Sequence, residues 1–103
     1  MYDLLEFDGV AKDWLFFLSR VSAKLYECDS NAWRRFELAR KRFAEALGWL
    51  ELEGEVDLAN SNAGDAMRIL KLCLPKAEQH WQVMVTVARA ALGRTVLREI
   101  LRS

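Results

Sequence analysis

The chain offers few side chains that could carry out catalysis. It contains one histidine, His80, and neither HxxxH nor HExxH spacing surrounds it. A nucleophilic mechanism needs a nucleophile, a base with a pKa near neutrality and a group that orients this base. The glycine-rich loops of nucleotide-binding proteins and the GxSxG nucleophile elbow are also missing. We therefore expect a protein that is not an enzyme, in which His80 is structural; an enzyme that uses His80 with acidic residues ranks last.

Acidic side chains and thiols could bind a metal ion, but their spacing argues against it. The pairs Glu51/Glu55 and Glu53/Asp57 are four residues apart, in a charged stretch that leads into a loop. Such a stretch is usually a solvated surface. Two cysteines without CxxC spacing suggest neither a zinc site nor a disulfide framework, so we expect reduced, buried thiols. No metal and no cofactor are expected.

Arginines are the remaining side chains that could form a binding site. Arg94, Arg98 and Arg102 are spaced at i, i+4 and i+8, which places three guanidinium groups on one ridge of a helix. Such a ridge could contact a nucleic-acid phosphate backbone or an acidic partner. It could equally complement the helix dipole and pair with the acidic N-terminal part of the chain. A second basic cluster, residues 34–42, is interleaved with aromatic rings, but these rings fall on a core face.

Charge is unevenly distributed along a chain that is neutral as a whole. Fifteen Lys and Arg residues balance fifteen Asp and Glu residues. Residues 1–67 carry a net charge of −5, and residues 68–103 carry +5. A neutral chain has no overall field that attracts nucleic acid or an anionic membrane. The sequence therefore favours helices of opposite charge that pack together, with a split binding surface as the alternative.

Helical periodicity accounts for most of the sequence. Apolar side chains recur at helical spacing over residues 10–27, 32–53, 63–74 and 75–92. Asp8 could cap the first helix, a Ser or Asn near residue 30 the second, and Pro75 suits the first turn of the fourth. The apolar residues after Gly93 face a different direction, which predicts a break or kink there. Gly48, inside the second helix, predicts a close backbone approach or a bend.

Four large apolar side chains do not fit these core faces. Residues 14–18, WLFFL, form an unbroken apolar run that circles the helix, and only Phe16 falls on its polar side. Leu38, Trp49 and Leu52 cluster opposite the core face of the second helix. Covering by a loop or by residues 2–7 is one explanation for Phe16. Surplus apolar surface on a small protein more often marks a contact with another chain.

We predict an all-α fold in a single helical-bundle domain, residues 1–103, with four main helices and a short C-terminal helix after Gly93. A length of 103 residues and 52% hydrophobic content suffice for one core. The predicted core consists of Trp14, Phe17, Val21, Phe36, Phe43, Leu47, Met67, Leu70, Trp81 and Met84. The sequence has neither a signal-peptide pattern nor a run long enough to span a membrane, so we expect a cytoplasmic protein without a membrane partner.

The expected function is a protein–protein interaction module: a small adaptor, inhibitor or subunit that binds a protein partner or another copy of itself. The predicted contact surface consists of Phe16, Leu38, Trp49 and Leu52. The alternative is a small helical subunit that contacts a nucleic-acid backbone through Arg94, Arg98 and Arg102. Zero net charge weakens this alternative, because binding to a phosphate backbone is driven mainly by charge.

Overall fold

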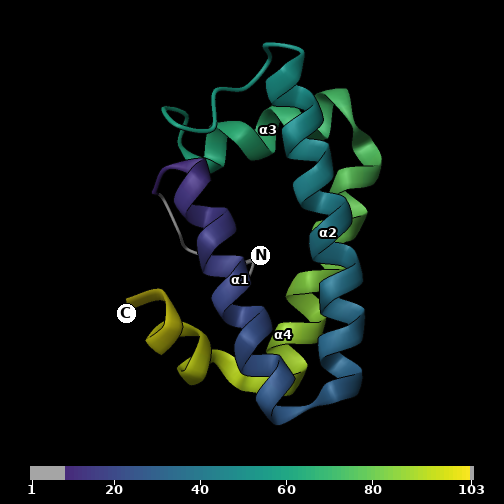
Figure 1. The fold of residues 1–103 in the computed structure, drawn as a ribbon, viewed down its shortest axis with the longest axis vertical. Coiled ribbons are helices and arrows are strands. Elements are labelled where there is room, and N and C mark those ends of the chain that lie inside the picture. Colours follow the sequence, from purple (N-terminus) through teal and green to yellow (C-terminus); the bar gives the residue numbers. More distant parts are fainter. Residues whose placement is uncertain (1–8, 103) are drawn as a thin grey trace.

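In a computed structural model, which describes residues 9–102, the chain folds into packed helices (Figure 1). They are α1 (Ala11–Cys28), α2 (Ser30–Leu52), α3 (Ala63–Cys73) and α4 (Pro75–Arg102). Within the described residues no strand forms, and one isolated β-bridge joins Val10 to Asn62. The predicted all-α class is therefore confirmed.

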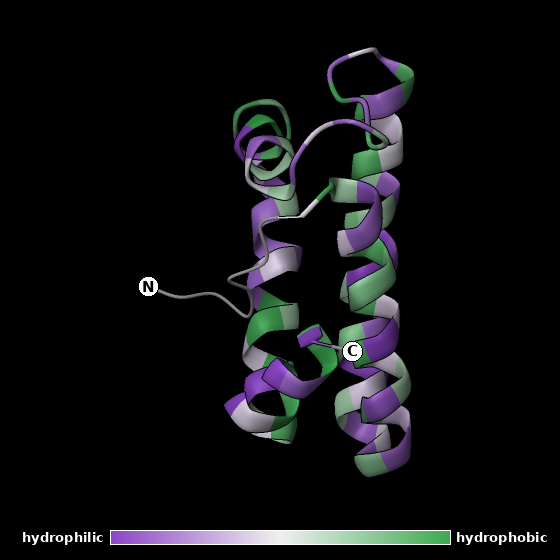
Figure 2. Ribbon diagram, turned by 90° about the vertical axis from the view of Figure 1, so that its left-hand side faces the viewer, coloured by the Kyte–Doolittle hydropathy of each residue, from purple (hydrophilic) through white to green (hydrophobic). Residues whose placement is uncertain are grey.

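The helices form two layers. Helices α1 and α2 make an antiparallel hairpin in front of α3 and α4 in Figure 1, and the view turned by 90° separates the two pairs into two columns (Figure 2). The most extensive helix contact joins α2 to α4 across the layers. Helix α2 therefore lies between α4 on one face and the surface of the molecule on the other.

Helix α1 begins differently from the prediction. Asp8, the predicted cap, lies outside the described residues, and Val10 occupies the N-cap position without a side-chain hydrogen bond. The first free N–H groups are satisfied by the loop that precedes α3: Ala11 donates to the carbonyl of Ser61 at 2.8 Å and Lys12 to that of Leu58 at 3.1 Å. A distant segment of the chain thus replaces the local cap.

Helix α2 is defined by capping at both ends. Asp29, rather than the predicted Ser or Asn, accepts hydrogen bonds from the backbone of Asn31 and Ala32, both at 3.1 Å. The C-terminus ends in a Schellman motif, in which Gly54 adopts a φ of 78° and Glu55 N–H donates to the carbonyl of Leu50 at 3.0 Å. Helix α2 continues unbroken through Gly48, and outside the neighbouring backbone of α2 no atom lies within 4 Å of the position that its Cβ would occupy.

A sharp change of direction occurs within α4 at Gly93. Its φ of 78° and ψ of 167° are not helical and are accessible almost only to glycine. The segment that follows turns toward the side where α1 lies (Figure 1). The break that the sequence predicts at this glycine is present, with a short helical arm after it.

Aromatic rings fill the centre of the core, where α1, α2 and α4 meet. Trp14 packs edge-on against Phe43 and Trp81, with ring centroids 5.3 Å and 4.7 Å apart, and Phe43 and Trp81 are 5.5 Å apart. All predicted core residues are buried except Met67, which is partly exposed. The reason lies in the short α3, which leaves one edge of its apolar face uncovered.

Candidate interaction surface

The structure leaves all four side chains of the predicted contact surface exposed. The exposed fraction is 70% for Phe16, 56% for Leu38, 53% for Trp49 and 87% for Leu52. Neither the loop between α2 and α3 nor α4 covers Phe16, and residues 2–7, the other expected cover, lie outside the described residues. These side chains are therefore accessible to another molecule.

The four residues do not form one continuous patch. Phe16 is on α1, whereas Leu38, Trp49 and Leu52 follow one line along the outward face of α2, with Arg42 and Glu45 between them. At 1.5 Å rise per residue, Leu38 and Trp49 are about 16 Å apart along the helix axis. We call the α2 line, residues 38, 42, 45, 49 and 52, the outer seam.

Three further large apolar side chains are exposed that the sequence analysis did not single out: Tyr26, Leu72 and Val83. Tyr26 contacts the ring of Trp33 edge-on, with centroids 5.0 Å apart, beside the α1–α2 turn. Leu72 is 76% exposed near the end of α3. The same helical-wheel projection that singled out Phe16 would have shown that Leu72 is displaced from its core face.

A polar network links α1 to α2 beside the core. The buried Ser22 hydroxyl donates to Glu37 Oε2 at 2.5 Å, and Arg40 binds the same carboxylate with two nitrogens, Nε at 2.8 Å and Nη2 at 2.6 Å. The bidentate Arg40 contact lowers the pKa of Glu37 despite opposing desolvation, with a further contribution from Ser22. The same contact raises the pKa of Arg40. This network holds the α1–α2 hairpin together on its polar side.

The three arginines of the C-terminal ridge, Arg94, Arg98 and Arg102, are exposed on the arm after Gly93. None forms a salt bridge with another residue between Gly9 and Arg102. Salt bridges between described residues include Glu37–Arg40, Asp65–Arg68 and Lys71–Glu78. The expected pairing between oppositely charged helices is thus not formed by these arginines with the described residues.

The residues considered for catalysis or metal binding do not gather into a site. Within residues 9–102 no group of three His, Cys, Asp or Glu side chains could hold a metal ion. Two acidic side chains instead order the loop after α2: Glu51 accepts from Leu58 N–H, and Asp57 accepts from Ala59 N–H and from Asn60. The Asn60 side-chain bond, aided by the Ala59 bond, lowers the pKa of Asp57.

The two cysteines differ from the prediction. Both Cys28 and Cys73 are free thiols, but they are exposed rather than buried. Each is the last residue of its helix, α1 or α3. His80 is half-buried on α4.

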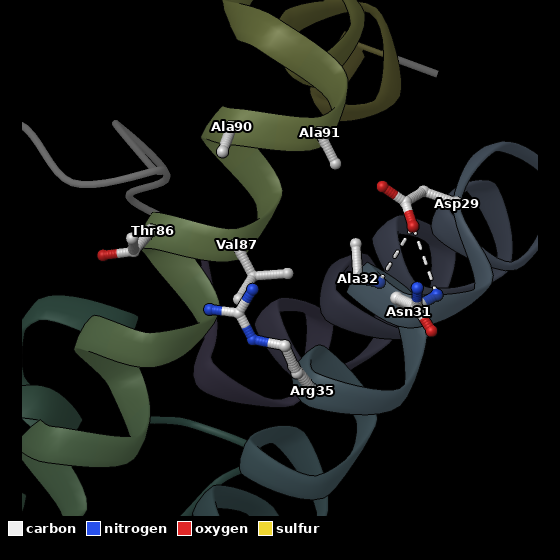
Figure 3. A pocket seen from close by; sticks show the side chains of 8 residues that line it. All are labelled: Asp29, Asn31, Ala32, Arg35, Thr86, Val87, Ala90 and Ala91. Atoms are coloured by element: carbon white, nitrogen blue, oxygen red, sulfur yellow. Dashed lines mark hydrogen bonds between the residues drawn. The ribbon is translucent and has the colours of Figure 1, made fainter.

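A shallow cavity of about 250 Å³ lies between the first turns of α2 and the part of α4 before Gly93 (Figure 3). Arg35 extends from α2 toward Val87, and small side chains such as Ala90 and Ala91 line the α4 side. The Asp29 carboxylate at its rim is already engaged in capping α2. The volume is below the range of most ligand pockets.

No helix among the described residues is long and apolar enough to cross a membrane. No protein family, curated protein or solved structure matches this chain. The chemistry of the exposed side chains is therefore the basis for any functional assignment.

Proposed function

We propose that this protein is a non-enzymatic interaction module that binds another protein chain through exposed apolar side chains. The observation that carries the proposal is the exposure of Trp49 and Leu52, three residues apart on the outward face of α2. Tryptophan is among the residues most enriched in binding hot spots. Leu38 on the same face and Phe16 on α1 extend the accessible apolar surface.

The exposure of these side chains is not needed for folding. Leu47 and Leu50, on the core side of α2, are fully buried, whereas Trp49 and Leu52 remain outside. An exposed Trp or Leu adds little to the stability of an isolated chain but can contribute to binding once a partner excludes water from it. A role in protein contact explains why they are present.

The test is a combined Leu38→Ala, Trp49→Ala and Leu52→Ala variant, compared with the wild-type chain by sedimentation velocity and by the size of the complexes it forms in the native extract. We expect wild-type protein to sediment above its monomer mass of 11.9 kDa or to lie in a stable complex. The variant should lose that association and keep its helical circular dichroism, because all three side chains are exposed.

The control variant replaces Arg94, Arg98 and Arg102 with alanine on the C-terminal arm. It should retain the association. If wild type and the apolar variant are equally monomeric and free of partners, the proposal is wrong. If only the arginine variant loses its partner, and the loss follows the salt dependence of phosphate binding, the nucleic-acid alternative takes its place.

A further inference from the structure

The outward face of α2 repeats the pattern of a coiled-coil seam. Residues 38, 42, 45, 49 and 52 of the outer seam are separated alternately by four and three positions, which is the heptad spacing of facing helices. All five are exposed. The core side chains Phe36, Phe43 and Leu50 lie on the opposite side of the same helix. Helix α2 therefore carries two seams, and the bundle uses only one.

Charge is polarised along α2. Its N-terminal part carries five cations and one anion, Glu37, which is paired with Arg40. The C-terminal part and the residues just after it carry only anions: the cations are Arg34, Arg35, Arg40, Lys41 and Arg42, and these anions are Glu45, Glu51, Glu53 and Glu55. An antiparallel pair of such helices sets basic against acidic segments twice. A parallel pair sets like charges against each other.

We propose that the outer seam binds the outer seam of a second copy of this chain, with the two α2 helices antiparallel. This proposal rests on the proposed function and identifies the protein partner as a second copy of the chain. A two-fold axis between Phe43 and Ala44 places Leu38 against the partner's Trp49 and Arg42 against the partner's Glu45. By symmetry, each contact occurs twice.

This register makes the seam complementary to itself at every facing position between 38 and 49. Two apolar contacts flank two central ion pairs, and positions a and d face each other as antiparallel coiled coils require. Arg42 and Glu45 are exposed, and neither forms a salt bridge within residues 9–102. Their charges are therefore available to a second chain.

Gly48 gives independent support. It lies within an unbroken helix beside the seam, and no atom is within 4 Å of its missing Cβ. Nothing in the described fold requires glycine there, although it weakens the helix relative to alanine. A second helix that approaches this edge closely accounts for the small residue.

The first experiment exchanges the central charges. Arg42→Glu alone sets a second carboxylate opposite the partner's Glu45, and Glu45→Arg alone sets a second cation opposite the partner's Arg42. By sedimentation equilibrium from about 1 µM to about 1 mM, we expect a wild-type dimer. Each single variant should dissociate at least about tenfold more readily, because like charges then face each other.

A double variant and a mixture of the two single variants make this test specific. The Arg42→Glu/Glu45→Arg double variant should recover an affinity within about threefold of wild type, because both ion pairs are restored with reversed polarity. An equimolar mixture of the two single variants should form heterodimers. Lys12→Glu, an exposed charge change on α1, is the matched control and should leave the dimer unchanged.

The orientation is tested by disulfide formation in a Cys28→Ser/Cys73→Ser background, which removes both native thiols. The Arg42→Cys chain, the Glu45→Cys chain and a mixture of the two are each oxidised. In the antiparallel register, the two new thiols face each other only in the mixture, whereas the second Arg–Glu pair is retained. We expect rapid cross-linking in the mixture and little in either variant alone.

These outcomes separate this proposal from the more general one. A monomeric wild-type chain over the whole concentration range, with a native complex that depends on Leu38, Trp49 and Leu52, means that the surface binds a different protein. A dimer that is indifferent to the charge exchange, or that cross-links equally within each single variant, overturns the antiparallel register.

Discussion

At the scale of single residues, Glu37 is a charged side chain that connects two helices. It receives hydrogen bonds from Ser22 on α1 and from Arg40 on its own helix. Hydrogen bonds to a charged group stabilise more than neutral ones, but partial exposure reduces the gain. The network therefore contributes about 1 kcal/mol to folding.

This contribution depends on pH. Because the pKa of Glu37 is lowered from its ordinary value of 4.5 on folding, its stabilisation is complete above that value and is lost as the pH falls through the lower pKa of the folded state. We expect Glu37→Gln to reduce the urea midpoint at about pH 6 and to have a smaller effect at about pH 3. Glu55→Gln, at an exposed position, is the control; an equal shift at both pH values contradicts the role of the ionised network.

Residue patterns predicted four of the large apolar side chains that lie outside the core, because helix geometry fixes the face on which each position falls. Phe16 and Trp49 are examples, since both stand among polar neighbours on a helical wheel. The exposed state of Cys28 was not predictable in this way. The exposure of Cys28 depends on where a neighbouring helix ends. The periodicity of a single helix does not predict that position.

At the scale of elements, two glycines in helices have opposite roles. Gly93 has a backbone conformation that L-residues rarely adopt, whereas Gly48 is helical with free space around its Cβ position. Gly93→Ala should destabilise the protein by about 1–3 kcal/mol, because the new side chain strains the turn or straightens the helix and removes Leu97 from the core.

Gly48→Ala should stabilise the chain by about 0.5–1 kcal/mol.

Both changes are measured by chemical denaturation in dilute solution, and the two variants serve as controls for each other. A stabilising Gly93→Ala substitution would mean that the kink is not required.

The kink itself was predictable, because the apolar positions change direction at Gly93. The start of α1 was not, since its N–H groups bond to carbonyls of Leu58 and Ser61, about fifty residues away in the sequence.

At the scale of the whole molecule, the aromatic cluster of Trp14, Phe43 and Trp81 joins three helices across the two layers. Trp81→Ala should cost about 3–5 kcal/mol, because it removes ring contacts and leaves a cavity. That is a large part of the stability of a small protein. Thermal unfolding followed by circular dichroism measures the loss. Leu72→Ala, at an exposed position, should change stability by less than about 0.5 kcal/mol, and equal effects of the two would contradict the central role of the cluster.

The helical class and nearly all core positions followed from periodicity, but the pairing of helices did not. Any amphipathic face can in principle meet any other, so the sequence alone did not show that α2 packs most extensively on α4. The outer seam became recognisable only once the opposite face of α2 was known to be filled. The sequence contains its self-complementary charges, but these charges can contact a second chain only because they are exposed.

The turn at Gly93 also separates two parts of the molecule that open to solvent at different rates. The arm beyond it is nine residues long, which is too short for a helix to be stable alone in water. Its helical state therefore depends on Leu97, its one buried side chain, and on the partly buried side chains around it. Local unfolding can release the arm while the aromatic centre stays closed, because none of the three central rings belongs to the arm. We therefore expect the amides of the arm to exchange with solvent hydrogen faster than those of the preceding turns of α4.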